Sequence, residues 1–118
     1  MYGGILATRT LIVHPSKDIL IAAYSHSLYA FRHSDATIVG VSTPHSHPIL
    51  CAHLDSNTQT ILSLDSAGHL AHSQLTPTGK IENSNNPHRI FIDDNLSEAT
   101  IFQSKDNELI FTAVTSTS

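Results

Sequence analysis

Short apolar runs alternate with polar, turn-forming clusters along the whole chain. Residues 54–75, LDSNTQTILSLDSAGHLAHSQL, contain the clearest example: a polar turn, an apolar run, an Asp-Ser-Ala-Gly turn and a second run. Two short runs joined by a turn of this composition are typical of a β-hairpin. The rest of the chain resembles copies of this hairpin. We therefore predict an all-β fold made of repeated hairpin units.

The first predicted unit has four strands. Residues 14–18, HPSKD, indicate a turn, because proline and small polar side chains favour tight turns. Residues 19–24, ILIAAY, are apolar on both faces, which indicates a strand that is covered on two sides. The predicted strands are residues 8–13, 19–24, 28–32 and 37–41.

The second predicted unit follows residues 44–48, PHSHP, whose two prolines forbid regular ladder pairing and indicate a loop between units. Its strands are placed at residues 49–54, 60–64, 69–74 and 88–92, and a third, incomplete unit has strands at 97–102 and 109–114. The expected buried core consists of Ile19, Leu20, Ile21, Ile61, Leu62, Leu64, Leu109, Ile110 and Phe111.

The spacing of these units favours a β-propeller. The second strands start at Ile19, Thr60 and Leu109, which are 41 and 49 residues apart, and the longer spacing contains an extra polar stretch. A period near 40 with four short strands is typical of four-stranded antiparallel propeller blades. We place blade 1 at about 5–43, blade 2 at about 44–92 and a partial blade 3 at about 93–118. A β-sandwich is the alternative fold.

Closed propellers have roughly four to eight blades, so a chain of about two and a half blades is expected to be a fragment of a larger propeller. Expressed alone, it would present unpaired strand edges and an uncovered apolar sheet face. Both features favour self-association.

Composition limits the possible functions. The 118 residues, 40% of them hydrophobic and 14% charged, suit one small globular domain. A formal net charge of −4 with six Lys and Arg residues argues against direct nucleic-acid binding. The single cysteine, Cys51, cannot form an internal disulfide and is expected to be a buried thiol. No signal peptide or transmembrane run is present, so we expect a cytoplasmic or nuclear protein that does not bind a membrane.

Residues 14–31 and 54–75 resemble WD-repeat blades, in which a proline or aspartate turn precedes an apolar strand and an Asp-x-x-Gly-like turn leads into the next strand. The chain contains no tryptophan and no Gly-His pair at the start of a blade, so the resemblance is to divergent repeats. It implies a non-catalytic scaffold that binds protein partners, as a subunit of a larger complex.

A second resemblance is to lactonase-type, 6-phosphogluconolactonase-like propellers. It covers residues 54–81 and the segment NNPHRIFIDD, where a Thr-Gly-Lys-Ile turn follows the blade and a Pro-His segment opens the next. That family works with polar residues at the central channel, and His88 and Arg89 fall on a matching segment. The implied alternative function is hydrolysis of a small sugar lactone.

Nine histidines raise the question of a metal site. His45 and His47 lie on one side of the chain if the loop is extended, but zinc requires three or four ligands, and no carboxylate is close in sequence. We expect both to be exposed loop residues, with a metal pair as the alternative. His69 and His72 are three residues apart on a strand and face opposite ways. No cofactor is expected.

Overall fold

The computed structural model describes residues 8–55, 57–83, 88–90, 96–106 and 108–115, and these form strands and turns without a helix. The strands are β1 Thr8–Val13, β2 Ile19–Tyr24, β3 Ser27–Arg32, β4 Thr37–Ser42, β5 Ile49–Asp55, β6 Thr60–Asp65, β7 His69–Leu75, β8 Ile81–Asn83, β9 His88–Arg89, β10 Leu96–Gln103 and β11 Leu109–Thr115. The described residues therefore include no helix long and apolar enough to cross a membrane.

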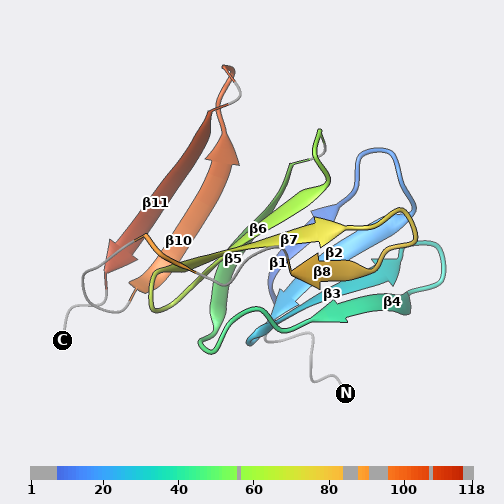
Figure 1. Cartoon of the computed structure of the whole chain (residues 1–118), viewed down its shortest axis with the longest axis horizontal. Coiled ribbons are helices and arrows are strands. Elements are labelled where there is room, and N and C mark those ends of the chain that lie inside the picture. Colours follow the sequence, from blue (N-terminus) through green and yellow to red (C-terminus); the bar gives the residue numbers. More distant parts are fainter. Residues whose placement is uncertain (1–7, 56, 84–87, 91–95, 107, 116–118) are drawn as a thin grey trace.

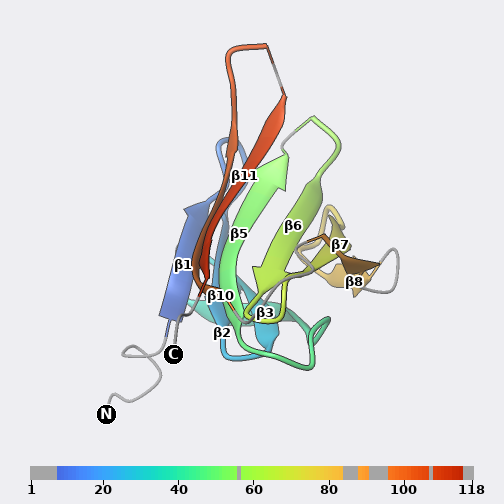
Figure 2. The same ribbon diagram turned by 90° about the vertical axis from the view of Figure 1, so that its left-hand side faces the viewer.

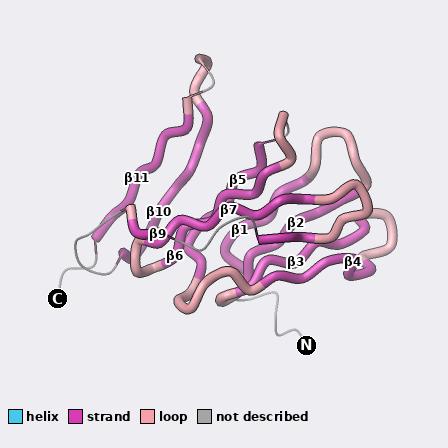
Figure 3. The backbone as a smooth tube through the Cα atoms, in the orientation of Figure 1, coloured by secondary structure: helices cyan, strands magenta, loops and turns pink. Residues whose placement is uncertain are grey.

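The strands form three antiparallel sheets. The first sheet has the order β1-β2-β3-β4, the second has β5-β6-β7-β8 with β9 also paired to β7, and the third is the pair β10-β11. Figure 1 shows the sheets one after another, from blue through green and yellow to red, and Figure 3 shows the tight loops that join their strands. The first strand of the second sheet, β5, lies beside β1 and beside β10, the first strands of the other two sheets (Figure 2). This is the arrangement of successive propeller blades.

The fourth strand of the second sheet differs from the prediction. It was expected at residues 88–92, but β8 and β9 share the outer edge of β7: Leu75 pairs with Ile81, and His69 pairs with Arg89. The chain therefore forms an additional short strand, β8, before the strand that was predicted. Residues 91 and 92 lie outside the described part of the chain.

One backbone contact repeats between successive sheets. Ser25, directly after β2, accepts a hydrogen bond from the N–H of Ile49 at the start of β5, with a nitrogen-to-oxygen distance of 2.6 Å. Ser66, directly after β6, accepts the equivalent bond from Leu96 at the start of β10, at 2.7 Å. The two acceptors are 41 residues apart, so the sequence repeat is also a repeat of geometry.

Two apolar cores join the three sheets. The first lies between the first and second sheets and includes Ile21 and Ile61, and the second lies between the second and third sheets and includes Leu62 and Leu64. The second sheet is therefore covered on both faces, as its apolar runs require.

The predicted core is confirmed for Ile19, Ile21, Ile61, Leu62 and Leu64, which are all buried. It is wrong for Leu109, which is 37% exposed, and Leu20, Ile110 and Phe111 are only partly buried. Leu20 and Ile110 lie on sheet faces that no other described sheet covers. Phe111 packs at the border of the second core, and Leu109 is the first residue of β11, next to the turn that follows β10.

Candidate functional site

The turn between β6 and β7 is built around the side chain of Asp65, the last residue of β6. Its Oδ1 accepts hydrogen bonds from the backbone N–H groups of Ala67 and His69, both at 2.9 Å. Gly68 has a φ of +84°, in the left-handed region that glycine occupies without a steric penalty. The Asp-Ser-Ala-Gly sequence thus fixes the carboxylate by short-range bonds of the kind that favour aspartate in turns.

His45 reaches the same carboxylate from the loop between β4 and β5. Its Nδ1 lies 2.9 Å from Oδ2 of Asp65 and its Nε2 lies 2.8 Å from Oγ of Ser63 in β6. An ionised carboxylate only accepts hydrogen bonds, so Nδ1 donates to Asp65, and the serine hydroxyl is the hydrogen-bond partner of Nε2. His45 is 4% exposed, so the prediction of an exposed loop residue is wrong at this position. A buried carboxylate needs such a partner.

The carboxyl group of Asp65 is held in its charged form. Burial raises its pKa, but the hydrogen bonds from His45 and from the backbone of His69 and Ala67, together with the charge of His45, outweigh that effect and lower the pKa below its usual value. The carboxylate is therefore negative at neutral pH, at a position where its side chain is 1% exposed.

Ser63, His45 and Asp65 are connected in the order of a hydrolase triad, in which a histidine links a serine hydroxyl to a carboxylate. A catalytic serine must reach substrate, whereas Ser63 and Asp65 are fully buried and His45 is nearly so. The arrangement therefore provides hydrogen-bond partners for buried polar groups, and it holds the loop before β5 against the second sheet.

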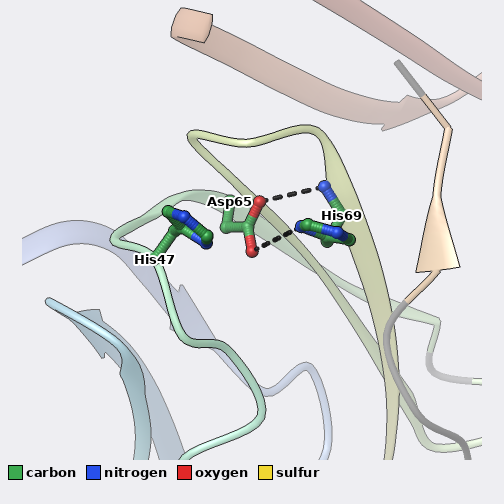
Figure 4. A group of neighbouring side chains, drawn as sticks. All are labelled: His47, Asp65 and His69. Atoms are coloured by element: carbon green, nitrogen blue, oxygen red, sulfur yellow. Dashed lines mark hydrogen bonds and ion pairs between the residues drawn. The ribbon is translucent and has the colours of Figure 1, made fainter. Parts of the chain in front are cut away.

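His47 and His69 lie beside the hydrogen-bonded group of Ser63, His45 and Asp65. One ligand atom from each of His47, Asp65 and His69 lies within 4.8 Å of the other two, and Nδ1 of His69 is 3.5 Å from Oδ2 of Asp65. Figure 4 shows the two imidazoles on either side of the carboxylate. His47 is exposed, as predicted, and His69 is about one third exposed. A neighbouring pocket of about 400 Å³ is lined by Thr43, Pro44, His45, Ser46, Asp65 and His69.

The lactonase-type candidates lie elsewhere on the second sheet. His88 in β9 is exposed and its ring stacks on that of His72, with 5.8 Å between the ring centroids. The side chain of Arg89 lies outside the described part of the chain. Burial, and to a smaller extent the charge of His88, lower the pKa of His72. In the described structure, Nδ1 of His72 and Nε2 of His53 are buried without a hydrogen-bond partner.

Cys51 in β5 is a buried, unpaired thiol, as predicted. Burial raises its pKa to about 11, so the thiolate needed for nucleophilic chemistry is scarce at neutral pH. Asp106 and Glu108 are exposed.

Comparison with known proteins decides the fold. The chain matches a chain in the crystal structure of a mitotic checkpoint complex with a TM-score of 0.67 over 92% of its length, at 10% sequence identity. It matches the C-terminal WD40 domain of Sif2 with a TM-score of 0.58 over 84% of its length, at 14% identity. The chain has the fold of WD40 propeller blades. It spans 38% and 29% of those two chains, respectively. No family model and no curated protein matches it.

The predicted resemblance to divergent WD-repeat blades and the all-β blade architecture are confirmed by these matches. The sequence did not reveal the roles of Ser63, Asp65 and His69. One signal was available: Ser63 is a polar residue inside the apolar run of β6, and a buried hydroxyl needs a partner. The sequence does not show that the partner is His45, which lies 18 residues earlier.

Proposed function

We propose that the chain is a non-catalytic protein-interaction scaffold that works within a larger assembly. The observation that carries this proposal is an apolar face on the first sheet, opposite the core that it shares with the second sheet. Leu11, Val13, Ile38 and Val41 on this face are between 52% and 60% exposed. Exposed apolar patches of this kind mark interaction surfaces.

Cross-strand register makes this face continuous. Val13 pairs with Leu20, Leu20 with Phe31 and Phe31 with Ile38, which gives one row across all four strands. A parallel row is formed by Leu11, Ala22, Tyr29 and Val41. Because side chains alternate between the faces of a strand, both rows point away from the core that contains Ile21. We call these eight residues the outward face.

A second copy of the chain is the partner that fits this face. The third sheet also carries apolar side chains on the face turned away from the second sheet: Phe102, opposite Ile110, is 43% exposed, and Val114 is 60% exposed. Within the molecule, each sheet packs one face on the next sheet along the chain. In the proposed dimer, the outward face of one copy packs on the third sheet of the other copy. This head-to-tail contact extends the same stacking of sheets from one copy to the next.

Photo-crosslinking tests this contact. A crosslinking amino acid at Val41 should give covalent dimers whose linked peptides contain Phe102 or Val114, whereas the same group at exposed Asn57 should give none. Crosslinks confined to one copy would contradict the proposed contact.

The proposal includes a cytoplasmic or nuclear location, where a reducing environment suits the unpaired thiol of Cys51. It includes no direct contact with nucleic acid, because the chain has few basic residues. The lactonase-like alternative, with His88 and Arg89, stays a prediction. Lactone hydrolysis by the purified chain that is lost in His88→Ala would support that alternative and contradict a non-catalytic role.

A further inference from the structure

Three potential metal ligands meet at one end of the second sheet. His47 comes from the loop before β5, Asp65 ends β6 and His69 begins β7. The imidazole rings of His47 and His69 are stacked, with 6.0 Å between centroids and 21° between planes. Their ligand atoms and that of Asp65 lie within 4.8 Å of one another (Figure 4). Two separate loops thus bring two imidazoles to one carboxylate.

These distances are near those of a metal site. Ligands at 2.0 to 2.2 Å from a tetrahedral zinc ion lie about 3.3 to 3.6 Å from one another. Asp65 Oδ2 and His69 Nδ1 are already 3.5 Å apart. His47 is exposed, so its side chain can rotate toward the other two ligands without breaking core packing.

Asp65 retains the capacity to bind an ion. A carboxylate offers about four acceptor positions, and three are occupied: Oδ1 by the N–H groups of Ala67 and His69, and Oδ2 by His45. The remaining position is on Oδ2, the oxygen that lies near His69 Nδ1. The bond to His45 orients the carboxylate, as outer partners of metal ligands commonly do.

We propose that His47, Asp65 and His69 bind a divalent transition metal ion such as zinc, with a fourth coordination position open to solvent. Two imidazoles and one carboxylate suit zinc, whereas calcium and magnesium prefer oxygen ligands throughout. The ion links the loop before β5 to the turn between β6 and β7. The ligand set differs from the His45 and His47 pair considered from sequence, because both nitrogens of His45 are hydrogen-bonded. The inference does not depend on the proposed self-association.

Isothermal titration of the tag-free chain with zinc chloride tests this site. We expect one ion per chain and an affinity that falls at least about tenfold in His47→Ala and in His69→Ala. His33→Ala is the matched control, since His33 is exposed in a turn of the first sheet. It should bind zinc as the wild type does.

A cobalt titration gives a second readout. Cobalt bound by two imidazoles and a carboxylate in a four-coordinate site should produce intense visible absorption, and His47→Gln should remove it. Because His47 is exposed, this variant keeps the fold, which circular dichroism can verify. The proposal is overturned if folded wild-type protein binds no zinc, or if the His47 and His69 variants bind it as tightly as the wild type.

Discussion

Gly40 in β4 lies against the backbone of Gly79, in the turn between β7 and β8, so closely that a Cβ on Gly40 would collide with the carbonyl oxygen of Gly79. The same Cβ would lie 3.0 Å from the Cα of Lys80. Gly79 itself has a φ of +97°, which fixes the path of the turn. The outer edges of the first two sheets therefore meet through two residues that lack side chains.

Gly40→Ala should lower the free energy of unfolding by about 1 to 3 kcal/mol, because the added methyl group meets backbone that cannot rotate away. Urea denaturation measures the change. Glu82→Ala, at an exposed site of the neighbouring strand β8, is the control and should change stability by about 0.5 kcal/mol or less. An alanine at position 40 that leaves stability unchanged or raises it would mean that the two sheets do not approach this closely.

His45→Ala should lower the free energy of unfolding by about 1 to 3 kcal/mol, because it removes a partner of the buried Asp65 carboxylate and leaves the Ser63 hydroxyl unsatisfied. Thermal and urea unfolding should both show the loss. His33→Ala, in an exposed turn, should have little effect on either measurement. Equal effects of the two substitutions would contradict the role assigned to His45.

His72 should make the protein less stable as the pH falls. Burial and the charge of His88 lower the pKa of His72 in the folded chain, whereas in the unfolded chain it takes up a proton near its ordinary pKa of about 6.5. The contribution is thus complete above that pH, and it is lost as the pH falls toward the folded pKa, because the unfolded state then binds more protons.

The measurement is the free energy of unfolding at pH 7.5 and at pH 5.5. His72→Gln should show a smaller decrease between the two values than the wild type, while His33→Gln should keep the wild-type decrease. If the decrease in His72→Gln matches that of the wild type, the pH dependence has another source.

Ile61→Ala should cost about 2 to 4 kcal/mol of stability, because Ile61 is fully buried in the core between the first two sheets. Leu109→Ala should cost about 1 kcal/mol or less, since Leu109 is partly exposed on β11. Equilibrium urea unfolding of both variants gives the comparison. A loss at position 109 as large as that at position 61 would place Leu109 in a core.

The strands could be predicted from sequence because the local signals are strong. Alternating apolar runs and turns rich in proline, glycine or aspartate predicted ten of the eleven strands found in the described residues, and the spacing between Ile19 and Thr60 predicted the repeat. The missing strand, β8, has three residues, too few for a period to be recognised. The exposure of Leu109 could not be predicted either, because the amino-acid pattern of β11 does not show how far along this strand the second sheet covers it.

The arrangement of histidines around Asp65 could be predicted only in part. The prolines around His45 and His47 correctly indicated a loop, and the turn at Asp65 was clear from its sequence. The contact between that loop and that turn forms because β6 runs back antiparallel beside β5. The sequence of the loop alone does not reveal this contact. Asp65 and His69 meet within one turn, whereas the stacking of His47 on His69 and of His72 on His88 depends on such long-range packing.

Sedimentation velocity of the purified chain over a wide range of concentrations tests the scaffold proposal most directly. The wild type should form species larger than the monomer as concentration rises. The double variant Leu11→Lys and Val41→Lys, which puts two charges on the outward face, should stay folded and monomeric. Thr37→Lys, at an exposed polar position of the same sheet, should associate as the wild type does. A wild-type chain that remains a monomer at every concentration and melts in one sharp transition would contradict the proposal that its outward face is a docking surface.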